Sequence, residues 1–126
     1  MLLNAIFSIK PKYAEKIFSG EKKFEFRTKI CKHAIDKIII YETSPVCMVV
    51  GEVCVTGIIK DSPSKLWNET KQFAGIEYNS FMEYFKNKKT AFAYVLSTPT
   101  KYEKHYKLSE FNIYTAPQSY IYLKNN

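Results

Sequence analysis

Three charged side chains whose types and spacing could do chemistry, Lys22, Glu25 and Arg27, lie within residues 20–27. A lysine ammonium is a mobile point charge that suits a phosphate or a carbonyl group. If residues 22–27 form a strand, Glu25 and Arg27 share one face about 6–7 Å apart along the backbone. A carboxylate held beside a guanidinium stays ionised, and it can accept hydrogen bonds from the edge of a base. The alternative is a solvated surface pair worth under about 1 kcal/mol.

Arg27 is the only arginine among 19 basic residues, and the other 18 are lysines. A guanidinium offers a planar fork to phosphate or carboxylate, which lysine does not. We therefore expect Arg27 to contact a phosphate or to stack on a ring. The net charge of +7 and the pI near 9.2 favour a polyanionic partner such as nucleic acid. Because the lysines are spread along the chain, the charge is also compatible with a purely solubilising role.

Length and composition predict a single domain that covers residues 1–126, with 46% hydrophobic and 25% charged residues. The three cysteines show no CxxC spacing, which favours reduced thiols in an intracellular protein. Cys31 and His33 form a C-x-H pair in a predicted polar loop, but two further metal ligands are missing. We expect no metal, no cofactor and no membrane span. The N-terminal segment reaches Lys10 and Pro11 too early for a signal peptide, which predicts a cytoplasmic protein.

The elements around the charged segment follow from local signals. Residues 2–9 form a predicted strand, and a helix follows from Pro11 to Gly20, where glycine provides a left-handed C-terminal cap. From residue 22 onward the hydrophobic period is two, with Phe24 and Phe26 facing the core and residues 23, 25 and 27 facing the other side. The same alternation places Thr28 on the phenylalanine face, away from the cleft.

The remainder of the chain predicts further strands and short helices. Strands are expected over residues 36–41, 46–59, 91–96 and 119–123, with a polar stretch over residues 97–105. Glycines inside the 46–59 strand, Gly51 and Gly57, mark bulges or bends that curl a sheet. Helices are expected from Ser62 to Gly75 and from Ser80 to Phe85. The pattern as a whole predicts an α+β domain.

The segment 8–27 resembles the opening of an ASCH domain, whose hallmark G-x-K-x-x-E-x-R is filled by Gly20, Lys22, Glu25 and Arg27. Further blocks similar to small prokaryotic and phage members are residues 41–45, 50–52, 66–67 and 117–120, so the resemblance covers nearly the whole chain. It implies the fold of the PUA-like superfamily, a closed β-barrel of about six strands with short helices packed outside. It also implies a cleft that is lined by the hallmark residues and binds RNA.

Other residues are secondary candidates for the same cleft. Lys10 is expected to border it, and Gln118 and Ser119 to add amide and hydroxyl contacts, although each also fits ordinary surface or strand-entry chemistry. Trp67 and Tyr84 offer rings on which a base can stack, because every base has a π-face. Their helical spacing favours instead a core role, in which they pack these helices on the barrel.

Two functions remain open at the level of the sequence. The first is a module that binds RNA or a modified nucleotide without breaking a bond. The second is a small hydrolase in which Lys22 and Glu25 act as an acid–base pair on RNA or on an acylated nucleoside. Some ASCH-fold amidohydrolases use a lysine and a threonine three residues later; here Glu25 occupies the threonine position, so a hydroxyl nucleophile is out of register. The oligomeric state is not predicted.

Overall fold

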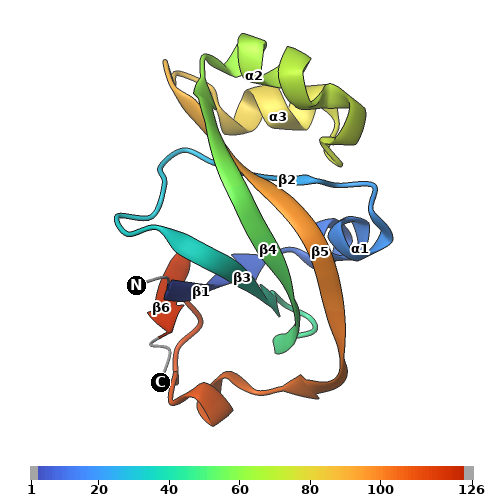
Figure 1. The fold of residues 1–126 in the computed structure, drawn as a ribbon, viewed down its shortest axis with the longest axis vertical. Coiled ribbons are helices and arrows are strands. Elements are labelled where there is room, and N and C mark those ends of the chain that lie inside the picture. The colour runs from blue at the N-terminus through green and yellow to red at the C-terminus, as the bar shows by residue number, and fades with distance from the viewer. Residues whose placement is uncertain (1–2, 124–126) are drawn as a thin grey trace.

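Six strands and three helices make up the part of the chain that the computed structural model describes, residues 3–123 (Figure 1). The strands are β1 (Leu3–Ile9), β2 (Phe24–Arg27), β3 (Ile35–Glu42), β4 (Met48–Asp61), β5 (Ala91–Tyr106) and β6 (Tyr120–Leu123). They form one sheet in the order β2-β5-β4-β3-β1-β6, in which β1 and β3 are parallel and all other neighbours antiparallel. The predicted α+β class is confirmed.

The sheet is not closed into a barrel, so the closed barrel that the resemblance implied is wrong. The first and last strands of the order, β2 and β6, pair only with β5 and β1 respectively. Both are four residues long, and no backbone pairing joins them within residues 3–123. Side chains bridge this gap instead, because Arg27 at the end of β2 contacts Ser119, the residue before β6.

Two glycines allow the long strand β4 to bend, as the sequence predicted. The pairing of β4 with β5 shifts register next to both Gly51 and Gly57. A Cβ atom at Gly51 would lie 2.5 Å from the carbonyl oxygen of Thr100 and 2.6 Å from the ring of Phe18. The strand therefore needs glycine at this bend, where the Phe18 ring and the β5 backbone approach it closely.

The main core lies between the curved sheet and α1 (Pro11–Ser19). This helix begins at Pro11 and ends at Gly20, whose φ of 87° is left-handed, as predicted. Its apolar face buries Ala14 and Ile17 against inward-facing residues of four strands. Because α1 leads directly into the segment before β2, the packing of α1 fixes the backbone position of Lys22.

A second core lies beneath α2 (Pro63–Thr70) and α3 (Tyr78–Tyr84), which cap one end of β4 and β5 (Figure 1). It joins Phe26 of β2 to Phe81 and Phe85, and the rings of Phe26 and Phe81 meet edge to face at 4.9 Å. The helix α3 starts at Tyr78, so the predicted start at Ser80 is wrong. Its first turn extends back to Glu77, whose carbonyl accepts a hydrogen bond from the amide of Phe81.

The strand β5 runs ten residues beyond its predicted end at Leu96. Its second half is exposed and polar, which is why the hydrophobic pattern predicted a loop there. Backbone pairing holds it in the sheet nonetheless, since Gly51 and Glu52 of β4 pair with Lys101 and Thr100. Tyr102 and Tyr106 pack against a third cluster on the opposite face of the sheet, which the 3₁₀ helix Leu108–Phe111 also covers.

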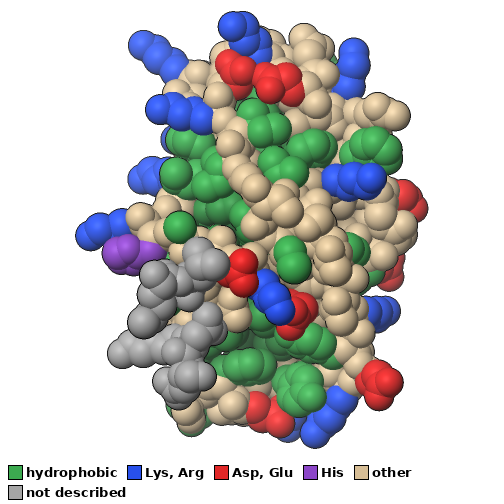
Figure 2. Space-filling model, viewed as in Figure 1, with side chains coloured by type: hydrophobic (Ala, Val, Ile, Leu, Met, Phe, Trp, Pro, Cys, Tyr) green, Lys and Arg blue, Asp and Glu red, His purple; other side chains and the backbone are tan. Residues whose placement is uncertain are grey.

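Basic side chains are scattered over the face seen in Figure 2, mostly along its outline, and no single basic patch dominates it. No helix within residues 3–123 is both long enough and apolar enough to cross a membrane. The same residues contain no group of three or more His, Cys, Asp or Glu side chains arranged to hold a metal ion.

Candidate functional site

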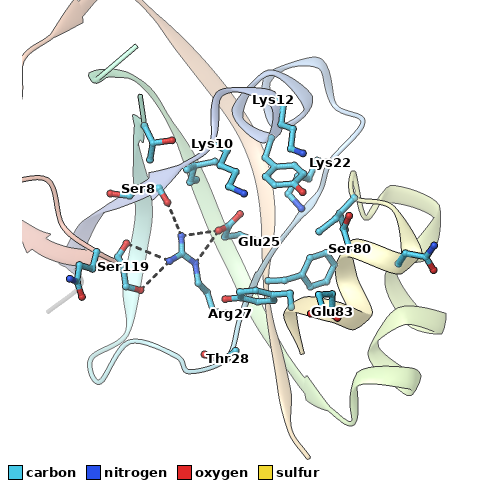
Figure 3. A pocket seen from close by; sticks show the side chains of 18 residues that line it. Ser8, Lys10, Lys12, Lys22, Glu25, Arg27, Thr28, Ser80, Glu83 and Ser119 are labelled. Carbon is cyan, nitrogen blue, oxygen red and sulfur yellow. Dashed lines mark hydrogen bonds and ion pairs between the residues drawn. The ribbon is translucent and has the colours of Figure 1, made fainter. Parts of the chain in front are cut away.

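A pocket of about 1100 Å³ opens between α1, β2, α3 and the segment that leads into β6 (Figure 3). Its volume matches the upper end of pockets that enclose small organic ligands, so a nucleotide fits within it. The structure brings together here, from three separate segments of the chain, six of the residues that the sequence singled out: Lys10, Lys22, Glu25, Arg27, Gln118 and Ser119.

Lys22 forms the most deeply buried cation of the pocket, with only 4% of its surface exposed. Its Nζ donates a 2.8 Å hydrogen bond to the carbonyl of Ala74 and lies 4.7 Å from the centre of the Phe26 ring and 5.3 Å from that of Tyr13. The other two N–H bonds meet no oxygen or nitrogen acceptor among residues 3–123. Burial lowers the pKa of Lys22 to about 8, although the charge of Glu25 opposes this shift.

The loop after α2 crosses directly over the Lys22 side chain, and Gly75 makes this possible. Gly75 has a φ of 65°, and a Cβ atom there would overlap the aliphatic stem of Lys22. The glycine thus brings the backbone close enough for the Ala74 carbonyl to hold the ammonium. The sequence predicted a helix that runs to Gly75, but α2 ends at Thr70 and a 3₁₀ turn ends at Phe73. Gly75 instead lies against the Lys22 side chain and positions it.

Glu25 and Arg27 form an ion pair along β2, as their spacing predicted. Both Nε and Nη2 of Arg27 lie close to one oxygen, Oε2 of Glu25, at 3.0 and 2.9 Å. The other oxygen, Oε1, accepts no hydrogen bond within the described part of the chain. Only 11–13% of the two side chains is exposed, so this pair is not the solvated surface pair considered as the alternative.

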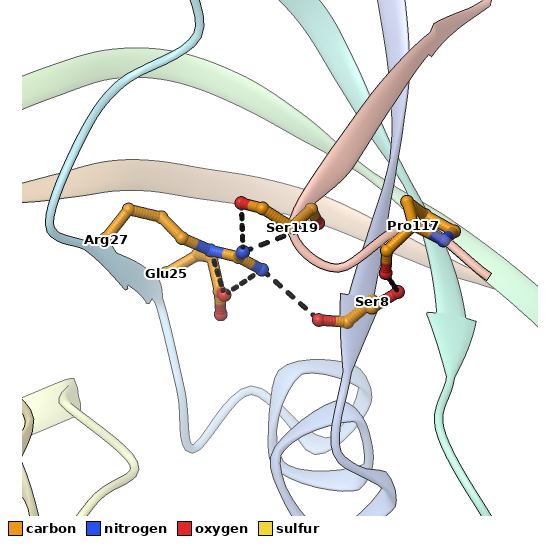
Figure 4. Close-up of polar contacts among 5 residues, drawn as sticks. All are labelled: Ser8, Glu25, Arg27, Pro117 and Ser119. Carbon is orange, nitrogen blue, oxygen red and sulfur yellow. Dashed lines mark hydrogen bonds and ion pairs between the residues drawn. The ribbon is translucent and has the colours of Figure 1, made fainter.

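The remaining contacts of Arg27 join three strands at the open side of the sheet (Figure 4). Nη1 donates to the hydroxyl of Ser119 at 3.0 Å and to its carbonyl at 3.4 Å, while Nη2 donates to the carbonyl of Ser8 at 3.3 Å. Its guanidinium carbon lies 4.6 Å from the centre of the Phe7 ring. All three nitrogens therefore have protein acceptors, and a phosphate could bind Arg27 only by displacing one of them.

The structure corrects two expectations about individual residues and agrees with the core packing favoured for a third. Thr28 lines the pocket rather than facing away, because β2 ends at Arg27 and the alternation of faces ends with it. Cys31 is buried against the main core, with its amide donating to the hydroxyl of Tyr94, whereas the predicted polar surroundings hold only for exposed His33. Trp67 packs on Phe81 and does not line the pocket.

Tyr84 behaves differently from Trp67, because it lines the pocket with 46% of its surface exposed. Sequence reasoning also missed several polar pocket residues on α1 and α3, namely Lys12, Tyr13, Asn79, Ser80 and Glu83. The spacing of Asn79 and Glu83 on one face of a helix was a usable signal. That this face points toward β2 depends on tertiary packing, which no local sequence pattern reveals.

The chain belongs to the ASCH family, because the model of the ASCH domain matches residues 7–117. An ASCH domain-containing ribonuclease of Zymomonas mobilis subsp. mobilis is 32% identical over 93 residues, which cover 73% of this chain and 63% of the ribonuclease. The ATP synthase subunit alpha of Ureaplasma parvum serovar 3 is 33% identical over 120 residues, which cover 94% of this chain and 15% of that subunit. The chain thus spans less than two thirds of either relative.

The fold agrees with that of a solved member of the family. The crystal structure of ASCH from Zymomonas mobilis superposes with a TM-score of 0.88 at 28% identity, covering 96% of this chain and 87% of that one. The open six-stranded sheet and its three helices are therefore the ASCH fold.

Proposed function

We propose that this chain binds single-stranded RNA in the pocket and cleaves a phosphodiester there, with Lys22 as general acid and Glu25 as general base. One observation carries the proposal: a buried ammonium with two unused N–H bonds shares the pocket with a carboxylate that has one unused oxygen. In addition, a relative that is 32% identical over 93 residues is a ribonuclease.

The proposed reaction uses the 2′-hydroxyl of the RNA as nucleophile. Oε1 of Glu25 accepts the proton of that hydroxyl while the 2′-oxygen forms a bond to phosphorus. The bond from phosphorus to the 5′-oxygen breaks, and the leaving oxygen takes a proton from Nζ of Lys22. The products are a 2′,3′-cyclic phosphate and a free 5′-hydroxyl. A proton then passes through water from Glu25 to Lys22, which restores both side chains.

The surroundings of Lys22 suit the role of acid. With a pKa near 8, the side chain is mostly protonated at neutral pH, yet it releases its proton more easily than an ordinary lysine. The rings of Phe26 and Tyr13 stabilise the charged form from two sides. Arg27 has a different part, because its contacts with Glu25, Ser8 and Ser119 hold the carboxylate in place.

The shape and charge of the pocket favour single-stranded RNA over a duplex. Bases within a duplex are stacked and their edges are paired, so only an unpaired nucleotide can enter a pocket of this kind. Lys10 and Lys12 are exposed at its border, where they can contact the flanking phosphates.

The test compares Lys22→Met with Lys23→Met, a neighbouring lysine that is exposed and lies outside this pocket. We expect Lys22→Met to lower cleavage of a labelled single-stranded RNA at least about 100-fold, because general acid catalysis contributes about 10²–10⁴-fold. Lys23→Met is expected to stay within about threefold of the wild type. Binding of RNA without any product would identify the module that binds without cleavage, and absence of both would reject the proposal.

A second candidate, deacylation of an acylated nucleoside, is favoured by one observation, the presence of the Thr28 hydroxyl in the same pocket as Lys22. Incubation with N4-acetylcytidine tests it. Acetate release that Thr28→Val abolishes would support this reaction over RNA cleavage.

A further inference from the structure

We infer that the exposed face of α3, formed by Asn79, Ser80, Glu83 and Tyr84, recognises one base of the bound RNA, and that this base is guanine. The inference rests on the proposed function and deepens it, because it names what the pocket selects. Lys10 and Lys12 on the opposite side of the pocket would then take the phosphates without regard to sequence.

The two faces of α3 differ sharply in character. Phe81 and Phe85 are buried in the second core with exposures of 0% and 2%. The four residues of the α3 face all line the pocket and are all exposed. Their positions, at i, i+1, i+4 and i+5, place them on one side of the helix. Packing of the two phenylalanines therefore fixes the direction in which this polar face points.

Charge divides the pocket into two sides. Lys10, Lys12 and Lys22 lie together on the side of α1, while Ser80 and Glu83 lie across from them on α3 (Figure 3). A phosphate is attracted by the lysine side and repelled by the Glu83 carboxylate. An RNA chain in the pocket is thus oriented with its backbone toward α1 and a base toward α3.

The donors and acceptors on the α3 face match guanine. Its N1–H and N2–H₂ groups are adjacent donors that meet the two oxygens of a carboxylate, and the Asn79 amide can donate to its O6 or N7 acceptor. Uracil offers one N–H flanked by two carbonyl oxygens, which a carboxylate repels. Tyr84 supplies a half-exposed ring held edge to face against Phe85 at 4.8 Å, which leaves a surface for stacking.

The test measures binding of 2′-O-methyl RNA heptamers, which lack the attacking hydroxyl and stay intact. Heptamers of uridine carrying guanosine, adenosine, cytidine or uridine at the centre are compared by fluorescence anisotropy at low salt. We expect the guanosine heptamer to bind at least about tenfold more tightly than the uridine heptamer, as one good bidentate contact gives about 1–3 kcal/mol of discrimination.

Two variants locate the source of that preference. Glu83→Gln should reduce the guanosine preference to less than about threefold, whereas Glu77→Gln, at the exposed N-cap residue of α3 outside the pocket, should leave it unchanged. The double variant Lys10→Gln, Lys12→Gln should weaken all four heptamers alike. Absence of a base preference in the wild type, or a preference that survives Glu83→Gln, would overturn the inference while leaving RNA binding intact. If no heptamer binds, the proposed function itself fails.

Discussion

The floor of the pocket around Lys22 and the open side of the sheet around Arg27 each hold one buried cation beside Glu25, but they differ in what remains unused. Every nitrogen of Arg27 has a protein acceptor, on Glu25, Ser8 or Ser119. Within residues 3–123, the Lys22 ammonium has a single hydrogen bond, to Ala74, and burial lowers the pKa of Lys22 to about 8.

This difference distinguishes a cation that stabilises the fold from one that can bind a ligand. A cation whose donors are satisfied by the protein stabilises the fold and orients its partner, whereas unused buried donors have a free energy cost that a ligand can remove. The sole arginine of the chain is thus a positioning residue at the gap between β2 and β6. Under the proposed function, ligand binding falls to Lys22, and the following predictions test this division between the two cations.

The largest effect is expected for Arg27→Ala, which leaves the Glu25 carboxylate buried without its partner. Breaking a buried pair in this way destabilises by about 4 kcal/mol, and the bridge to Ser119 is lost as well. Chemical denaturation measures the change. The double variant Glu25→Gln, Arg27→Met should recover at least half of the loss, because no unpaired charge remains. An Arg27→Ala protein as stable as the wild type would contradict the assigned role.

Lys22 should make the protein more stable as the pH rises, whereas a lysine in a stabilising ion pair would make it less stable. Its pKa is about 8 in the folded protein and about 10.4 in the unfolded chain, so the unfolded state binds more protons between these values. The free energy of unfolding therefore rises with pH across that window, by about 3 kcal/mol in total.

The measurement is the difference in unfolding free energy between the wild type and Lys22→Met at pH 8 and at pH 10.5. Taking the difference removes the contribution of Tyr94 and Tyr102, whose pKa values burial raises and which lower stability at high pH in both proteins. A difference that stays constant with pH would show that Lys22 titrates alike in the folded and unfolded chain.

Gly75, in the loop over Lys22, can be compared with Gly20, because both glycines have a positive φ. Alanine at either position costs about 1–2 kcal/mol in backbone strain, because both residues are left-handed. A Cβ atom at Gly20 meets open space, while one at Gly75 overlaps the Lys22 stem. Gly75→Ala should therefore also lower RNA cleavage about tenfold, and Gly20→Ala should not. Equal cleavage by the two variants would refute a positioning role for Gly75.

The smallest effect is expected at the rim, where Tyr84 contributes stacking alone. Tyr84→Ala should weaken binding of a 2′-O-methyl RNA heptamer about tenfold, since stacking of a base on an aromatic ring is worth about 1–3 kcal/mol. Tyr84→Phe should bind like the wild type. Tyr78→Ala, which removes an equally exposed tyrosine that packs on Trp67 outside the pocket, is the control.

Local patterns in the sequence were sufficient for the elements that carry the site. Proline and glycine marked both ends of α1, and the alternation of Phe24 and Phe26 with charged residues identified β2. The resemblance to ASCH domains then brought Lys22, Glu25 and Arg27 together, and the structure places them in one pocket.

What the sequence could not supply depends on contacts between distant segments. The second half of β5 is polar and exposed, and only its pairing with β4 makes it a strand. That β2 and β6 are the edges of the sheet depends on the pairing of strands that are far apart in the sequence. The approach of Gly75 to Lys22 and the direction of the α3 face likewise arise from tertiary packing, which leaves no local pattern.

An NMR titration of the Lys22 side chain, with and without a saturating 2′-O-methyl RNA heptamer, decides whether this lysine meets the ligand. We expect a pKa near 8 in the free protein and a pKa at least about one higher when a phosphate receives the two unused N–H bonds. A Lys22 pKa that is unchanged by bound RNA would contradict the claim that this lysine, rather than Arg27, is the cation that meets the ligand.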